Sequence, residues 1–152
     1  MGIVEDISKS SYDVGNDIIN TVINYYLSPI KEKYDVEVDG YIDENILIEQ
    51  RDLCIVSANL VKNAVEAVKK LESGEIRVRV SKGERYFSIK VENDFEGNLT
   101  WGKNGLPVTT KEIKNNHGIG LRNVNEVIRK YDGRYHADIV DGKYIVEVFL
   151  KL

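Results

Sequence analysis

Hydrophobic residues recur at helical spacing in three stretches of the chain. These stretches run from Gly15 to about Glu32, from about Glu49 to Glu72, and from Gly120 to about Tyr131. Because apolar positions three and four residues apart share one face of a helix, we predict three amphipathic helices. Pro29 is expected to end or bend the first helix, and Ser73-Gly74 to end the second.

Alternating apolar and polar residues predict five strands, at 34–38, 76–80, 87–91, 135–140 and 144–150. Lys82-Gly83 and Asp141-Gly142 are turn sequences that join neighbouring strands into hairpins, so the sheet should be largely antiparallel. Helices must then cover one face of that sheet. The predicted fold class is α+β: a two-layer α/β sandwich in which three helices cover a mixed, mostly antiparallel sheet.

The periodicity disappears between Asn93 and Gly118. This segment contains several glycines, Trp101, Pro107 and two adjacent threonines. A loop of this length inside a compact domain is typical of a functional lid or of a disordered segment. Both interpretations stay open from the sequence.

Composition narrows the class of protein. The 152 residues are 42% hydrophobic and 30% charged, as expected of one globular domain with a hydrophobic core. The net charge of −4 argues against nucleic-acid binding. A single cysteine, Cys54, excludes an internal disulfide framework and fits a reducing compartment. Only two histidines are present, which excludes a histidine-rich zinc site.

Targeting signals are not visible in the chain. No apolar run approaches the ~20 residues of a membrane span, and no secretory signal precedes the domain. We therefore expect a cytoplasmic domain without direct membrane contact. Residues 1–11 are polar and are expected to be an N-terminal extension or a cloning boundary, followed by one domain at 12–152.

A polar stripe runs along the second predicted helix. At 100° per residue, Asn59, Asn63, Glu66 and Lys70 fall within about 60° of one another. An apolar band lies beside the stripe and comprises Leu53, Val56, Leu60, Ala64, Val68 and Leu71. The sparse charge and the apolar neighbours favour a cavity-facing stripe over a solvated face. Its amide oxygens suit a hard cation that keeps most of its waters, such as Mg²⁺ arriving with a nucleotide.

Glycines stand where the long loop becomes the third helix, in the sequence Gly118-Ile119-Gly120-Leu121. Glycines at a helix N-terminus let backbone N–H groups approach an anion, which the positive end of the helix also attracts. A turn followed by a helix cap is the simpler alternative. Upstream, Thr109-Thr110-Lys111 could close on phosphates with hydroxyls and an ammonium, or be an exposed polar loop.

Polar residues also follow the strand predicted at 87–91. The segment from Asn93 through Asp94 and Phe95 to Gly97 brings an amide and a carboxylate to the end of that strand. Such groups could read a nucleobase. An Asx turn that closes the strand is the alternative.

In this order, the four motifs resemble the nucleotide-binding fold shared by gyrase, Hsp90, MutL and histidine kinases, the GHKL or Bergerat superfamily. The motifs are Asn59 to Ala64, Asn93 to Gly97, Thr110-Lys111 and His117 to Leu121. More narrowly, they resemble the ATP-binding catalytic domain of sensor histidine kinases of the peptide-pheromone quorum-sensing type. In that subgroup an asparagine replaces the adenine-binding aspartate of Asp-x-Gly-x-Gly. The resemblance covers roughly Tyr12 to Leu152.

The resemblance implies a role for each matching residue. Asn59 and Asn63 would hold Mg²⁺ and the phosphates of ATP. Asn93 would contact the adenine amino group, with Asp94 as the fallback. Gly97 would be the second glycine of the adenine box, and Thr110 and Lys111 would belong to the ATP lid. The glycine box on the phosphate side would consist of Gly118, Ile119, Gly120 and Leu121.

Two departures from the family pattern bear on function. Asn93 is neutral, and Phe95 stands where the first glycine of the adenine box is expected. These departures motivate one alternative, a protein-binding module that keeps the fold without nucleotide activity. An anti-sigma-type serine kinase of the same fold is a second alternative.

The family's phosphoacceptor histidine lies on a separate dimerising helix, and neither His117 nor His136 matches its position. The resemblance therefore implies a histidine protein kinase whose catalytic half alone is present in this chain. It would donate the γ-phosphate of Mg-ATP to that helix of a membrane-anchored receptor, with a response regulator downstream. No self-phosphorylation is expected from this chain alone.

Overall fold

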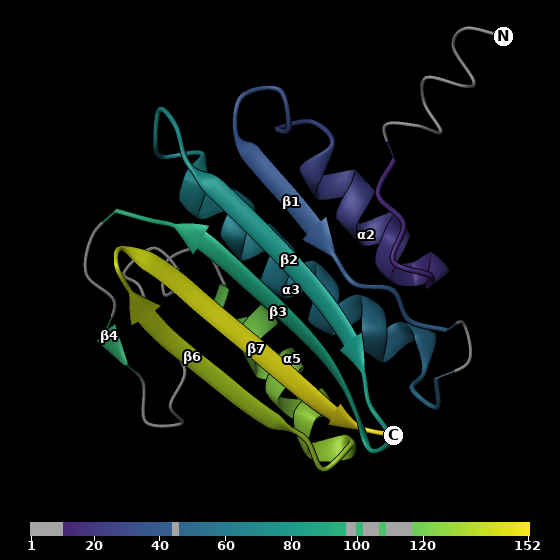
Figure 1. The fold of residues 1–152 in the computed structure, drawn as a ribbon. Helices are drawn as coiled ribbons and strands as arrows, with labels where there is room; N and C mark the ends of the chain where they lie inside the picture. The colour runs from purple at the N-terminus through teal and green to yellow at the C-terminus, as the bar shows by residue number, and fades with distance from the viewer. Residues whose placement is uncertain (1–10, 44–45, 97–99, 102–106, 109–116) are drawn as a thin grey trace, which may run out of the picture.

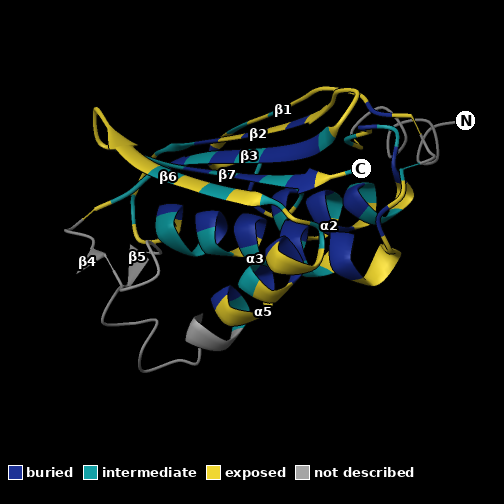
Figure 2. Cartoon of the chain, turned by 90° about the horizontal axis from the view of Figure 1, so that it is seen from below, coloured by how far each residue is buried: buried dark blue, intermediate teal, exposed yellow. Residues whose placement is uncertain are grey.

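Three helices pack on one face of a five-stranded sheet (Figure 1). The computed structural model describes residues 11–43, 46–96, 100–101, 107–108 and 117–152. The helices are α2 (Asp17–Leu27), α3 (Gln50–Val68) and α5 (His117–Lys130). The sheet order is β1-β2-β3-β7-β6, with the strands β1 (Asp35–Asp39), β2 (Glu75–Lys82), β3 (Tyr86–Asp94), β6 (Arg134–Val140) and β7 (Lys143–Lys151). Seen along the layers, the helices lie on one side and the sheet on the other, which confirms the predicted α+β sandwich (Figure 2).

The sheet is mixed. β1 pairs with β2 in parallel, and the other three pairings are antiparallel. The parallel pair requires a long crossover, which α3 supplies. The β6–β7 hairpin turns at Asp141 and Gly142, whose φ angles of 51° and 77° are the positive values that a tight hairpin turn needs.

The apolar sides of the strands and of α3 form the core. Alternate residues of β2 and β3, among them Val78 and Ile89, are buried against the helices. The predicted apolar band of α3 is buried from Leu53 to Val68, whereas Leu71 is only half-buried. Among the described residues, no helix is long and apolar enough to cross a membrane.

The expectation that Pro29 ends the first helix is confirmed, because α2 ends at Leu27 with Ser28 as its C-cap, although the helical pattern had suggested an end near Glu32. The predicted end of the second helix at Ser73-Gly74 was wrong: α3 ends at Val68, so Lys70 lies beyond the helix. After both helices the chain forms a turn that is tighter than an α-helix, with hydrogen bonds between residues three apart. The Ile30 N–H donates to the Leu27 carbonyl, and the Leu71 N–H donates to the Val68 carbonyl.

The start of the third helix and the structure of the long loop were also mispredicted. α5 begins at His117 instead of Gly120. The glycines at 118 and 120 therefore belong to the first turn of the helix, whose N–H groups have no acceptor within the helix. The segment expected to lack regular structure contains two short paired strands, β4 (Thr100–Trp101) and β5 (Pro107–Val108).

A buried carboxylate ties the start of α3 to the end of α5. The Asp52 side chain is 7% exposed, and its Oδ2 accepts hydrogen bonds from Lys130 Nζ at 2.8 Å and from the Tyr131 hydroxyl at 2.6 Å. Lys130 also pairs with Glu49 at 3.1 Å. Burial raises the pKa of Asp52, but the hydrogen bonds from Lys130 and Tyr131 outweigh burial and hold that pKa below its ordinary value.

We expect Asp52→Asn to lower the free energy of unfolding at pH 7 by about 2 kcal/mol, because Lys130 loses a charge-assisted partner. The Asp52 pKa is lower in the folded than in the unfolded chain, so its contribution is complete above the unfolded pKa of about 3.9 and is lost as the pH falls through the folded pKa. Urea unfolding of both proteins at pH 7 and below pH ~4 measures this difference.

Asp39→Asn is the matched control, because Asp39 is exposed at the end of β1. It should change stability by less than about 0.5 kcal/mol at pH 7. A loss from Asp52→Asn that stays constant at every pH would show that the Asp52 charge does not stabilise the fold.

Candidate functional site

A small pocket lies where α3, α5 and the sheet meet. Its lining residues come from five elements and are Leu60, Asn63, Ala64, Val91, Asn93, Leu121, Tyr135, Tyr144 and Val146. Its volume is about 10 Å³, enough for about one water molecule. The fold thus brings together Asn63, Asn93 and Leu121, three residues that the sequence analysis selected from separate motifs.

Asn93 lies on the helix-facing side of β3, opposite Tyr144 of β7. The residue is 3% exposed. The amide Nδ2 donates to the Asp94 carbonyl at 3.0 Å. The Oδ1 has no hydrogen-bond partner among the described residues, so the pocket offers one unused acceptor at this position.

Asp94 points to the other face of the sheet, because successive strand residues alternate in direction. Its Oδ2 accepts from the Glu75 N–H at 2.8 Å and its Oδ1 from Lys143 Nζ at 3.0 Å. Hydrogen bonds to Glu75 and, secondarily, to Asp94 raise the pKa of Lys143. Asp94 therefore links β2, β3 and β7 and does not line the pocket.

Asn59 faces the first turn of α5. Its Nδ2 donates to the Ile55 carbonyl at 2.6 Å, which fixes the amide along the helix. A Cβ placed on Gly120 would collide with Asn59 Oδ1, so a larger residue at position 120 would displace the Asn59 amide from its present position.

The glycine box occupies the first turn of α5, which begins at His117. N–H groups in this turn lack acceptors within the helix and give its N-terminus a positive potential. Gly118 and Ile119 lie in that turn, and Gly120 brings it against Asn59. Gly97, Thr110 and Lys111 lie outside the described residues.

The amide side chains of α3 fit a divalent ion only as part of a larger complex. Asn63 is half-buried, and its amide has no hydrogen-bond partner among the described residues. In that part of the chain, no group of three His, Cys, Asp or Glu residues could hold a metal ion. Neutral amide oxygens suit Mg²⁺ that phosphates already bind, because such an ion keeps its waters and few protein ligands.

Sequence reasoning missed the aromatic residues of the pocket. The Tyr135 and Tyr144 hydroxyls lie 3.3 Å apart, and the Phe95 and Tyr144 rings meet edge to face with centroids 6.4 Å apart. Both tyrosines share the helix-facing side of the β6–β7 hairpin with Val146. The sequence alone could have identified the two tyrosines as residues of the same face, because Asp141-Gly142 sets the register of the hairpin and side chains alternate between its faces.

Comparison with known proteins identifies the class. A model described as a GHKL domain matches residues 48–151, so the chain belongs to the GHKL family. No curated protein matches it.

Solved structures of histidine kinases share the fold. The catalytic domain of histidine kinase ThkA superposes with a TM-score of 0.67 at 20% identity, over 89% of this chain and 91% of that one. The mycobacterial sensor histidine kinase MprB gives 0.63 at 14% identity, over 89% and 93%. The histidine kinase domain of a blue-light activated kinase from Erythrobacter litoralis gives 0.64 at 14% identity, over 97% and 67%. The chain is thus a GHKL domain with the fold of histidine kinase catalytic domains.

The contact between Gly120 and Asn59 can be tested with a double-mutant cycle. The change in the free energy of unfolding caused by Gly120→Ala should be about 1–2 kcal/mol more destabilising in the parent than in an Asn59→Ala background. In the parent the new methyl displaces the Asn59 amide and breaks its bond to Ile55, whereas alanine otherwise favours the helix. Urea unfolding of the four proteins measures this coupling.

Asn63→Ala, one turn further along α3, is the control background. There, Gly120→Ala should have the same effect as in the parent. Equal effects in all three backgrounds would show that Gly120 does not constrain Asn59.

Proposed function

We propose that the chain binds Mg-ATP between α3, α5 and the sheet and acts as the catalytic domain of a two-component sensor histidine kinase. The γ-phosphate would pass to a histidine on a separate dimerisation segment. The supporting observation is that Asn63, Asn93 and Leu121 line one pocket, while Asn59 lies against the first turn of α5. A solvated polar stripe would not converge on a pocket in this way.

Each part of the proposed site offers a different interaction. Asn93 Oδ1 would accept from the exocyclic amine of adenine, and the N–H groups at the start of α5 would face the phosphates. Asn59 and Asn63 would hold Mg²⁺, which neutralises phosphate charge when bound. Phosphoryl transfer depends mostly on positioning and charge neutralisation, which this arrangement can supply without a protein nucleophile.

The proposal extends to partners. We place the phosphoacceptor in a helix outside the site, because neither histidine of this chain fits that role: His117 begins α5 and His136 is exposed on β6. A response regulator would act downstream. We also propose a peptide-pheromone receptor as the source of the domain, on the strength of Asn93 in place of aspartate and of the sequence motifs.

Asn63→Ala should remove measurable Mg-ATP binding, weakening it at least tenfold, because an amide oxygen is lost from the metal and phosphate site while no core side chain changes. Calorimetric titration measures binding. Thermal melting without nucleotide should show an unchanged fold. Saturation of the parent at 100 times its Kd should add about 2.7 kcal/mol of stability.

Lys62→Ala is the matched control, since Lys62 neighbours Asn63 on α3 but is exposed. It should bind Mg-ATP like the parent. If Asn63→Ala also binds like the parent, the metal and phosphate site is misplaced. If the parent itself gives no thermal shift at millimolar Mg-ATP, the protein-binding module becomes the better description.

Asn93→Asp should strengthen ATP binding by up to about tenfold, because a carboxylate forms a charge-assisted bond with the adenine amine and desolvation offsets part of the gain. It should discriminate more strongly against GTP, since an amide can rotate and donate to the guanine carbonyl but a carboxylate cannot. Calorimetry with both nucleotides gives the ATP-to-GTP affinity ratio for each protein.

Asp94→Asn serves as the comparison, because Asp94 lies on the other face of the sheet and should leave that ratio unchanged. An unchanged ratio in Asn93→Asp would mean that Asn93 does not face the base. A ratio altered by Asp94→Asn alone would transfer the role to Asp94.

A further inference from the structure

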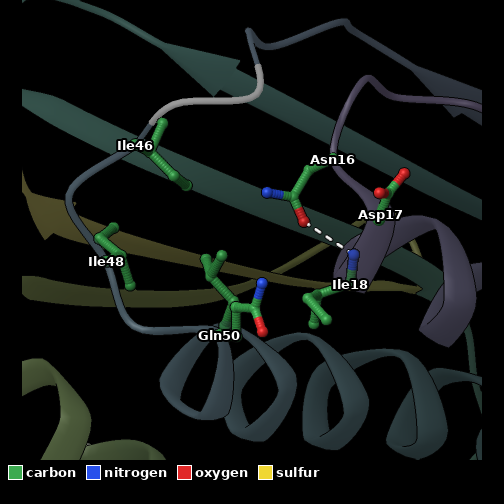
Figure 3. A pocket seen from close by; sticks show the side chains of 7 residues that line it. Asn16, Asp17, Ile18, Ile46, Ile48 and Gln50 are labelled. Atoms are coloured by element: carbon green, nitrogen blue, oxygen red, sulfur yellow. Dashed lines mark hydrogen bonds between the residues drawn. The ribbon is translucent and has the colours of Figure 1, made fainter.

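A second pocket, here called the N-terminal pocket, opens where α2 and α3 begin (Figure 3). Its volume is about 260 Å³, and its lining residues are Asn16, Asp17, Ile18, Ile46, Ile48, Gln50 and Leu53. None of them lines the small pocket of Asn63 and Asn93, at which nucleotide is proposed to bind between α3, α5 and the sheet. The proposed nucleotide site therefore leaves this pocket without a role.

Asn16 presents an unused donor to the N-terminal pocket. Its Oδ1 caps α2 by accepting from the Ile18 and Ile19 N–H groups, each at 3.0 Å, and this fixes which end of the amide carries Nδ2. The residue is only 8% exposed. Figure 3 shows Nδ2 pointing into the pocket, and it has no hydrogen-bond partner among the described residues. A donor that faces a pocket and has no partner indicates a place for an acceptor.

The lining of the N-terminal pocket combines aliphatic residues with the polar Asn16, Asp17 and Gln50. Ile48 and Leu53 are buried, and Ile18 and Ile46 are half-buried, so a branched aliphatic side chain can pack against this part of the lining. Leu47, between the two lining isoleucines, is 85% exposed. Leu47 therefore adds exposed apolar area next to the pocket, which an occupant of the pocket would cover.

A second exposed apolar residue extends this surface. Tyr41 is 70% exposed, and its ring lies against Gly15, directly before Asn16. The neighbouring Ile42 N–H donates to the Val14 carbonyl at 2.8 Å, which holds the two segments together. Tyr41 and Leu47 therefore flank the pocket, as expected when its occupant is part of a larger chain.

The charge of the lining residues determines which kind of occupant the pocket would attract. Asp17 is the one charged lining residue, and its side chain is exposed. A cationic group beside the aliphatic side chain would be attracted to it, whereas an anionic group would be repelled.

We propose that the N-terminal pocket docks a peptide segment of a partner protein that inserts a leucine-like side chain beside a lysine or arginine. The aliphatic group packs against Ile18, Ile46 and Leu53. A backbone carbonyl of the segment accepts from Asn16 Nδ2, and the cation lies near Asp17. This interaction goes beyond the proposed function and does not depend on nucleotide binding.

The probe is the peptide acetyl-Gly-Lys-Leu-Gly-amide, titrated into the ¹⁵N-labelled chain to ~10 mM and followed by NMR. We expect the shifted amide signals to cluster at residues 16–18 and 46–53. Replacing leucine by alanine, or lysine by glutamate, should weaken binding at least fivefold. Shifts that are absent or spread over the whole chain, or equal affinity for the alanine peptide, would overturn the proposal.

Two variants test the contacts. Asn16→Ser keeps an oxygen that can cap α2 but removes the amide donor, and Asp17→Asn removes the charge at an exposed position. Each should weaken peptide binding at least threefold, whereas Asp39→Asn should not. The proposal is wrong if both variants bind the peptide like the parent, or if leucinamide binds as tightly as the peptide, which would indicate a small-molecule site.

The same variants separate this proposal from the proposed function. Asn16→Ser and Asp17→Asn should bind Mg-ATP like the parent, and Asn63→Ala should bind the peptide like the parent. Loss of peptide binding in Asn63→Ala would show that the two pockets are not independent and would overturn the assignment of a separate site.

Discussion

The close packing of α3 against α5 is the constraint on which the candidate site depends. At one end of this contact, Gly120 lets the first turn of α5 reach the Asn59 amide. At the other end, Lys130 and Tyr131 hold the buried carboxylate of Asp52. With both ends fixed, the N-terminus of α5 faces the middle of α3, where Asn59 and Asn63 lie. A shift of α5 along α3 would break the Asp52 hydrogen bonds and move the first turn of α5 away from Asn59 at the same time.

The electrostatics of the site are local. The chain carries a net charge of −4, so its overall field repels a polyphosphate. The groups that would favour phosphate are the amides of α3 and the first turn of α5, which carry partial charges only. Such groups act over short distances, which makes their placement decisive.

The two faces of the sheet differ in function, and the neighbouring residues Asn93 and Asp94 lie on opposite faces. Asn93 faces the helices and presents an acceptor to the pocket, whereas Asp94 faces away and joins Lys143 and Glu75 across neighbouring strands. The N-terminal pocket is formed by other segments, where α2 and α3 begin (Figure 3). Binding of a partner there and binding of a nucleotide at Asn63 can therefore coexist in one small domain.

Local patterns in the sequence predicted three helices and five strands, the Asp141-Gly142 hairpin, the buried band of α3 and the α+β class. These features follow from hydrophobic periodicity and turn geometry, which neighbouring residues determine. The helix ends were less predictable, because the α5 start and the tight turn after Val68 depend on how the chain meets the rest of the fold. The motif order also selected Asn63, Asn93 and Leu121, but it could not show that they line one pocket.

Tertiary structure decided what depends on residues far apart in the chain. Asp52 and Lys130 are 78 positions apart, and neither stands out by its local pattern. Which of Asn93 and Asp94 faces the helices required the strand register, since a shift of one residue would exchange their faces. The open amide of Asn16 is visible only once the segment at 46–48 packs beside it. Local sequence determines the elements because it acts through short-range sterics and periodicity, whereas a site forms only where packing brings separate elements together.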